Sequence, residues 1–151
     1  MEIVVTNHLT EYYSQQINNL WNDEYPLSLR DRFHLLFDDA TNSKHYLICD
    51  SEETVLAWGA YFEKDSEIRF SIIVRENQQG NGLGSMIIER IKDDLDEFYG
   101  WVIDHDTDKK ANSEFYQSPL EFYIRHGFEV LTDVRIDTDM IRAVKIHYKK
   151  P

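Results

Sequence analysis

The sequence predicts an α/β domain of the α+β type, in which a mixed, mostly antiparallel central sheet of about seven strands is flanked by about four helices. Short runs rich in β-branched and aromatic residues predict the strands. Other segments repeat apolar residues at every third or fourth position, which is typical of amphipathic helices. The length of 151 residues allows one domain with a substantial core, and we expect residues 1–151 to form it.

The N-terminal half is expected to contain two helices and four strands. Thr10 is a suitable N-cap for a helix whose apolar residues continue to Trp21, and Pro26 ends that helix. Residues 28–37 carry a second apolar stripe at helical spacing and predict a second helix. Strands are expected over residues 1–7, 45–50, 54–63 and 67–74, with turns at 51–53 and 64–66.

The C-terminal half is expected to contain two helices and three strands. An apolar stripe predicts a central helix over residues 83–98, although acidic residues gather at its C-terminal end, where the helix dipole disfavours them. Ser118 and Glu121 form a capping box around Pro119, and Gly127 ends this last helix. The remaining strands are expected over residues 101–103, 128–134 and 142–148.

Composition restricts the partners and the compartment. The net charge of −12 argues against nucleic acid as a partner, and is compatible either with a cationic substrate or with acidity that serves solubility. Cys49 is the only cysteine and is expected to be a small core residue in a reducing compartment. Residues 1–5 lack the pattern of a signal peptide, and no apolar run has the length of a membrane span. We therefore expect a cytoplasmic protein without a membrane partner.

The segment Gln79-Gly80-Asn81-Gly82-Leu83-Gly84 is the most informative part of the chain. It lies between a strand-like run that ends at Val74 and the apolar stripe of the central helix. A tight glycine turn that leads into a helix leaves main-chain N–H groups unpaired at the positive end of the helix dipole. This arrangement predicts a site for the phosphates of a small molecule.

Two common phosphate-binding motifs do not fit this segment. A P-loop needs Lys-Ser or Lys-Thr after its glycines, and neither pair follows here. A dinucleotide-binding turn needs a third glycine at position 83 or 87, which are Leu83 and Ile87. An ordinary turn between a strand and a helix remains the simplest alternative, because glycine serves such turns readily.

The same segment resembles the coenzyme A signature of the GNAT superfamily of N-acetyltransferases, which is Q/R-x-x-G-x-G/A after a strand. Gln79, Gly82 and Gly84 match that signature. Residues 122–128, Phe-Tyr-Ile-Arg-His-Gly-Phe, resemble the F-Y-x-x-x-G-F segment near the C-terminus of the family. The resemblance implies acetyl-CoA as co-substrate, and main-chain donors must provide most of its binding in so acidic a chain. Arg75, Lys109, Lys110 and Arg125 are candidates for local positive charge near its phosphates.

The resemblance also implies a set of site residues. In the family, the strand before the glycine turn is bulged and splays from the next strand, and its main chain holds the pantetheine and the thioester oxygen. Tyr123 matches the tyrosine that often protonates the leaving thiolate, with Tyr116 as the alternative. Glu67 is the candidate general base, with Asp104, His105 or a water relay as alternatives. The implied cofactor-binding residues are Ile72, Ile73, Val74, Gln79, Gly80, Asn81, Gly82, Leu83, Gly84 and Ser85.

The segment 104–117 is longer than usual for the family and is expected to shape the acceptor pocket or an oligomer contact. Its first residues superficially resemble a calcium loop, but Lys109 and Phe115 occupy the positions that require glycine and glutamate. A zinc site would need more ligands at suitable spacing. We therefore expect no metal.

The predicted activity is transfer of an acetyl group from acetyl-CoA to a primary amine, by direct attack in a ternary complex. The acceptor is expected to be a small cationic molecule, received by Asp23, Glu24 and Asp31 in the N-terminal helical region. The alternatives are a non-catalytic coenzyme A-binding sensor or interaction module, an acetyltransferase of protein lysines or N-termini, and a different nucleotide-binding protein. The resemblance makes a homodimer possible.

Overall fold

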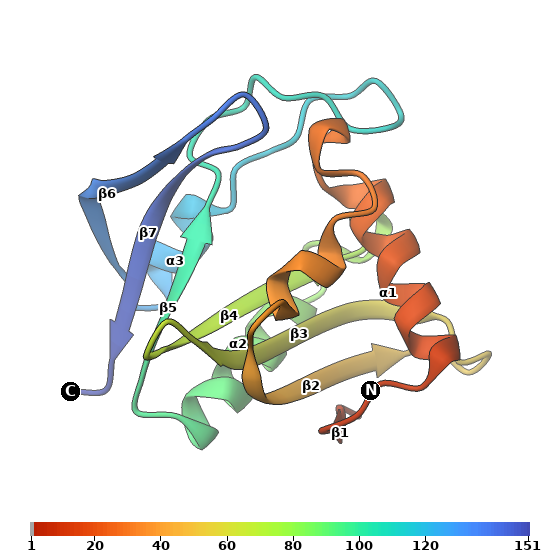
Figure 1. The fold of residues 1–151 in the computed structure, drawn as a ribbon. Coiled ribbons are helices and arrows are strands. Elements are labelled where there is room, and N and C mark those ends of the chain that lie inside the picture. The colour runs from red at the N-terminus through yellow and green to blue at the C-terminus, as the bar shows by residue number, and fades with distance from the viewer. Residues whose placement is uncertain (1) are drawn as a thin grey trace.

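A computed structural model describes residues 2–151 and contains one seven-stranded sheet with the strand order β1-β2-β3-β4-β5-β7-β6 (Figure 1). All neighbouring strands are antiparallel except β4 and β5, which are parallel. The strands are β1 (Val4–Thr6), β2 (Thr41–Cys49), β3 (Val55–Lys64), β4 (Glu67–Val74), β5 (Glu97–Val102), β6 (Glu129–Asp137) and β7 (Arg142–Lys149). The α-helices are α1 (Glu11–Glu24), α2 (Leu83–Asp94) and α3 (Leu120–Arg125), and the 3-10 helices are η1 (Leu27–Leu29), η2 (Phe33–Phe37) and η3 (Glu76–Gln78).

The predicted mixed, mostly antiparallel sheet is confirmed, but the described residues contain three α-helices where about four were expected. The helix predicted over residues 28–37 is wrong, because this segment forms the short 3-10 helices η1 and η2. Asp31 between them has a φ of 60°, and its side chain accepts hydrogen bonds from Asn18 and Asn22 of α1. This tertiary contact overrides the helical spacing. The first predicted strand is observed as β1, and Met1 lies outside the described residues.

The central helix α2 ends at Asp94, four residues earlier than predicted. Leu95 is already extended, and Phe98 is a buried residue of β5 opposite Tyr148 of β7. The carboxylate of Asp94 accepts hydrogen bonds from Lys44 and Tyr46 of β2. The acidic run therefore continues past the end of the helix, and its last helical residue, Asp94, anchors the helix end to the sheet.

The predicted capping box of α3 does not form, and the N-cap is Pro119, without a side-chain cap hydrogen bond. The Oγ atom of Ser118 accepts a hydrogen bond from the N–H of Leu120 at 3.3 Å. The N–H of Ser118, however, donates to Asp106 at 2.7 Å rather than to Glu121. Asp106 thus connects the segment 104–117 to the start of α3.

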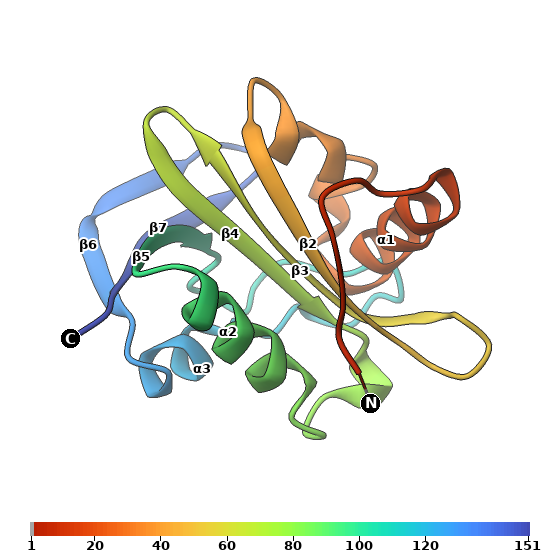
Figure 2. The same cartoon turned by 90° about the horizontal axis from the view of Figure 1, so that it is seen from below.

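Helices cover both faces of the sheet, α1 with η1 and η2 on one face and α2 with α3 on the other (Figures 1 and 2). Each face has its own apolar core. The first core centres on Ile87, Ile91 and Phe98 beneath α2 and α3, and the second on Leu20 and Trp58 beneath α1. Strand β4 carries residues of both cores, and the sheet opens beside this strand.

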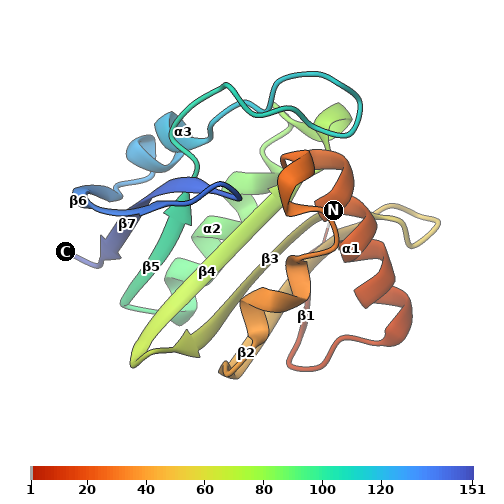
Figure 3. The same ribbon diagram turned by 45° about the horizontal axis from the view of Figure 1, so that its top comes forward.

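Strands β4 and β5 meet at a single register pair, Arg69 with Tyr99, and then diverge (Figures 1 and 3). The ring of Phe70 fills the junction, because a Cβ on Gly100 would lie 2.5 Å from Phe70 Cε1. The splay expected from the family resemblance is therefore present. The expected bulge is absent from the β3–β4 ladder, whose register runs without a shift from Lys64–Glu67 to Ala57–Val74.

Candidate active site

The opening between β4 and β5 leaves one edge of β4 without a neighbouring strand. The N–H of Arg75 donates to Leu56 of the β3 side at 2.9 Å, and alternate residues of an antiparallel strand point to the same neighbour. Ile73 therefore directs its N–H toward β3, whereas Ile72 and Val74 direct theirs into the opening. The carbonyl of Val74 accepts a hydrogen bond from Gln79 Nε2 at 3.1 Å, in agreement with this direction.

The glycine turn presents the N-terminus of α2 beside this edge. Gly82 has a φ of 80° in the left-handed region, which glycine adopts without strain, and it is the N-cap of α2. The cap has no side-chain hydrogen bond, and the first helical hydrogen bond runs from the N–H of Met86 to the Gly82 carbonyl at 3.0 Å. The N–H groups of Leu83, Gly84 and Ser85 thus have no partner within the helix, as an anion-binding helix N-terminus requires.

The two segments that carry the family resemblance lie side by side. A Cβ added to Gly84 would lie 3.2 Å from the ring of Phe122 on α3. Ser85 Oγ lies 3.1 Å from Nε2 of His126, the C-cap of α3. The absence of a side chain at Gly84 therefore brings the first turn of α2 against α3 and places Tyr123 close to the opening.

A cavity of about 240 Å³ occupies the α1 side of the opening. Tyr123 lines it together with Ile72 of β4, Tyr116 of the segment 104–117, and Tyr25, the C-cap of α1. Burial, with a smaller contribution from Tyr25, raises the pKa of Tyr123 well above the ordinary value of a phenol. Tyr123 therefore keeps its proton at neutral pH.

Tyr25 is a cavity residue that the sequence analysis missed. Its ring packs edge-on against Trp21 and against Tyr116, with centroid separations of 4.4 and 5.8 Å. The available signal was an aromatic residue four positions after Trp21 and directly before Pro26, where the helix had to end. Its contact with Tyr116 spans most of the chain and could not be read from that signal.

Comparison with known proteins identifies the family. The acetyltransferase (GNAT) domain family matches residues 42–130, which is more than half of the chain and includes the glycine turn and residues 122–128. The chain belongs to the GNAT acetyltransferase family. It is therefore an acetyl-CoA-dependent N-acetyltransferase, as the sequence resemblance predicted.

Solved structures of other GNAT proteins share the fold. ElaA from Escherichia coli superposes with a TM-score of 0.72 at 14% identity, covering 99% of this chain and 100% of ElaA. A GNAT acetyltransferase from Staphylococcus aureus gives 0.66 at 12% identity over 99% and 100%. The spermidine/spermine N-acetyltransferase SpeG from Vibrio cholerae gives 0.62 at 14% identity over 98% and 92%. A search of curated protein sequences gave no match.

Glu67, the predicted base of this GNAT domain, is engaged in ion pairs. Its two carboxylate oxygens accept hydrogen bonds from Arg69 Nε at 2.8 Å and from Lys145 Nζ at 2.7 Å. Partial burial raises the pKa of Glu67, but the hydrogen bonds and charges of Lys145 and Arg69 outweigh burial and hold the pKa below its ordinary value. Glu67 is also not among the residues that line the cavity, so the geometry does not favour it as a base.

The alternative bases lie elsewhere. Asp104 accepts two hydrogen bonds from Arg135 at 2.7 and 3.2 Å, and these hold the pKa of Asp104 below its usual range. His105 Nδ1 contacts the hydroxyl of Thr107 at 2.8 Å, and its Nε2 is buried without a hydrogen-bond partner among the described residues. Neither Asp104 nor His105 lines the cavity of the GNAT domain.

The acidic residues expected to receive a cationic acceptor are also committed to other contacts. Asp23 pairs with Arg75 at 3.4 Å, and Asp31 is held by two asparagines of α1. Glu24 is buried, accepts a hydrogen bond from the N–H of Glu76, and pairs with Lys110 at 3.6 Å. None of the three acids lines the cavity, so this expectation for the acceptor is not supported. Arg75 and Lys110, which were candidates for phosphate contacts, are likewise paired.

The segment 104–117 does contribute to the acceptor side. Tyr116 lines the cavity, and the carbonyl of Lys109 accepts a hydrogen bond from the N–H of Leu27 at 2.7 Å. Within residues 2–151, no group of three or more His, Cys, Asp or Glu side chains is arranged to hold a metal ion. The same residues include no helix that is both long and apolar enough to cross a membrane.

Proposed function

We propose that this GNAT enzyme transfers the acetyl group of acetyl-CoA to the primary amine of a small molecule, by direct attack in a ternary complex. One observation carries the proposal. The sheet opens between β4 and β5, an uncapped helix N-terminus lies on the α2 side of the sheet, and a tyrosine-lined cavity is lined by residues of both strands at the opening. Two ligands that enter from opposite faces of the sheet can therefore meet in the opening.

The cofactor side binds through main-chain groups. The N–H groups of residues 83–85 receive the pyrophosphate, and the glycine turn from Gln79 to Gly82 brings it close to the backbone. Ile72 and Val74 offer their N–H groups to the pantetheine and the thioester oxygen, while Ile73 contributes a buried side chain beneath α1. Main-chain donors suit this chain, because binding a polyanion with side chains would require a basic surface.

The chemistry needs a neutral amine, a stabilised oxyanion and a proton for the leaving thiolate. Main-chain N–H groups fixed along β4 stabilise the oxyanion without reorganising. Tyr123 supplies the proton to the thiolate sulfur. A water molecule removes the proton from the amine, because the candidate bases Glu67, Asp104 and His105 all lie outside the cavity.

The first experiment measures thermal unfolding with acetyl-CoA, with ATP and NAD as controls. A ligand at about 100 times its dissociation constant adds about 2.7 kcal/mol to the free energy of unfolding, which is a Tm increase of several degrees. A shift with acetyl-CoA alone supports the proposed cofactor site. The absence of any shift at millimolar acetyl-CoA contradicts it.

The second experiment replaces the proposed acid. Tyr123→Phe keeps the ring but removes the hydroxyl, so we expect kcat to fall by about 100-fold or more while the thermal shift with acetyl-CoA is retained. Tyr116→Phe is the matched control in the same cavity. A loss of turnover in Tyr116→Phe alone reassigns the acid to Tyr116. Binding of acetyl-CoA without turnover of any amine indicates the non-catalytic module instead.

A further inference from the structure

The charged side chains that line the acceptor-side cavity, among the described residues, are all cationic, although the net charge of the protein is −12. These side chains are Arg32, Lys64 and Arg69, and none of the lining residues is acidic. The chain contains 28 acidic and 16 basic residues, so an exclusively cationic lining departs from its composition. The rest of the lining is mainly apolar and aromatic, including Trp21, Leu36, Phe62, Trp101, Met140 and Ile141.

The three cations come from three separate elements that meet on the α1 face of the sheet. Arg32 is the N-cap of η2, Lys64 closes β3, and Arg69 lies in β4 two residues before Ser71, which also lines the cavity. Figure 3 shows the orange segment that carries η1 and η2 crossing in front of the sheet. Folding therefore gathers positive charge that is dispersed in the sequence.

Arg32 is the cation with unused donors. Its main chain is fixed, because its N–H donates to Leu29 at 3.1 Å and its carbonyl accepts from Leu35 at 3.0 Å. Its guanidinium makes no salt bridge or hydrogen bond with any residue in the range 2–151. By contrast, Arg69 is paired with Glu67 and Asp65, and Lys64 Nζ donates to the carbonyl of Leu35 at 3.2 Å.

We propose that the acceptor is a primary amine that carries an anionic group on an apolar body, and that Arg32 binds that group and determines specificity. This inference rests on the proposed function. A guanidinium binds a carboxylate or a phosphonate through paired, charge-assisted hydrogen bonds. The apolar lining accepts the body of the acceptor.

The unpaired guanidinium of Arg32 favours the chemistry and disfavours polyamines. A nearby positive charge disfavours the protonated form of an amine and lowers its pKa. The neutral nucleophile is then more abundant, which suits a site whose cavity lacks a carboxylate base. A polyamine would bring several positive charges into this field and gain no partner. Electrostatics thus selects for an acceptor whose own anion balances the cavity.

The test compares acceptors that share a phenethylamine body, with and without a carboxylate, and adds a polyamine. With the full chain and saturating acetyl-CoA, we would measure kcat/KM for phenethylamine, for its carboxylated counterparts phenylalanine and 4-(2-aminoethyl)benzoate, and for spermidine. We expect at least one carboxylated amine to exceed phenethylamine by about tenfold or more, as a charge-assisted contact implies. Spermidine is expected to be the poorest acceptor.

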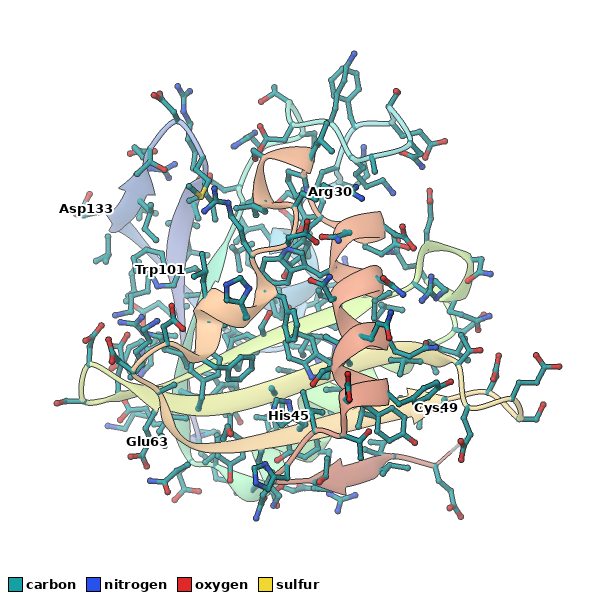
Figure 4. All side chains as sticks on the ribbon, turned by 45° about the vertical axis from the view of Figure 1, so that its right-hand side comes forward. Arg30, His45, Cys49, Glu63, Trp101 and Asp133 are labelled. Atoms are coloured by element: carbon teal, nitrogen blue, oxygen red, sulfur yellow. The ribbon has the colours of Figure 1, made fainter. Side chains whose placement is uncertain are left out.

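The matched variants are Arg32→Gln and Arg30→Gln. Arg32→Gln is expected to raise KM for the carboxylated amine and to lower its selectivity over phenethylamine by about tenfold. Arg30 is exposed, does not line the cavity, and lies apart from the cavity residue Trp101 in Figure 4. Arg30→Gln should therefore keep the selectivity of the parent protein.

The outcomes separate this inference from the proposed function. Turnover that favours spermidine or phenethylamine, or an unchanged selectivity in Arg32→Gln, overturns the anionic acceptor while leaving the acetyltransferase in place. A protein that acetyl-CoA does not stabilise overturns the proposed function and the inference with it, whereas a protein that acetyl-CoA stabilises but that acetylates none of the four amines overturns the inference alone. The thermal shift with acetyl-CoA is expected to be equal in both variants, which shows that they fold.

Discussion

The two sides of the β4–β5 opening present different parts of the chain to their ligands. On the α2 side, the groups that face the opening are main-chain N–H groups of Ile72, Val74 and the first turn of α2. On the α1 side, the cavity is formed by side chains from α1, η2, β4 and the segment 104–117. Main-chain recognition depends on backbone conformation, whereas side-chain recognition can change with each residue. One scaffold can therefore keep its cofactor and vary its acceptor.

The largest effect that we expect from the α1 side is on stability. His45 of β2 (labelled in Figure 4) is 4% exposed, packs against Phe37 of η2, and accepts a hydrogen bond from Trp58 Nε1 at 3.1 Å. Burial lowers the pKa of His45 from 6.5 to about 4. The folded protein thus favours neutral His45, and this stabilisation is complete above pH 6.5 and is lost as the pH falls toward 4.

From pH 7 to pH 5, this loss amounts to about 2 kcal/mol of unfolding free energy. His45→Gln keeps an acceptor for Trp58 but does not titrate, so its stability should fall by about 2 kcal/mol less over the same range. Denaturant unfolding at both pH values measures the difference. His8→Gln, at an exposed histidine, is the control. An identical pH dependence in the parent and in His45→Gln would contradict the buried neutral histidine.

A smaller effect is expected on the α2 side. Gly82→Ala introduces a side chain at a φ of 80° without a steric contact, so its cost is conformational, about 1 kcal/mol of stability. The distorted helix start should raise KM for acetyl-CoA by about tenfold and leave the selectivity among acceptors unchanged. Steady-state kinetics with Asp93→Ala, at an exposed residue of α2 outside the glycine turn, as control checks this. A change in acceptor selectivity without a change in KM for acetyl-CoA would reverse the assignment of the two sides.

The smallest effect concerns Glu67. Because Arg69 and Lys145 already occupy its carboxylate, Glu67→Gln should change kcat by no more than about threefold. Glu63→Gln, at an exposed residue of β3 (Figure 4), is the control. A general base contributes about 100-fold or more. A decrease of that size in Glu67→Gln alone would restore the sequence-based prediction that Glu67 is the base.

The sequence predicted best what depends on backbone conformation. Alternation and turn residues located most strands of the sheet, and the left-handed glycines identified the start of α2. The failures have tertiary causes. Asn18 and Asn22 of α1 hold Asp31 in a turn and split the predicted helix over residues 28–37. The acidic end of α2 binds β2 instead of extending the helix.

The acceptor side was harder to predict, because its residues meet only in the folded chain. Ser28 donates a hydrogen bond to the carbonyl of Met140, 112 residues away, and so joins the N-terminal region to the β6–β7 turn. Net charge suggested a cationic acceptor, but it averages over the whole surface. The local lining has the opposite sign, and no periodicity or motif connects Arg32 with Arg69.

The unpartnered edge of β4 also has a signature in amide hydrogen exchange. Along this strand, Ser71 and Ile73 donate toward β3, whereas Ile72 and Val74 face the opening. Protected and unprotected amides should therefore alternate with a period of two residues, because exchange reports hydrogen bonding at each N–H. Acetyl-CoA should slow the exchange at Ile72 and Val74 and erase the alternation. The isotope pattern of four consecutive amides would then report, in solution and without turnover, whether the opening is occupied.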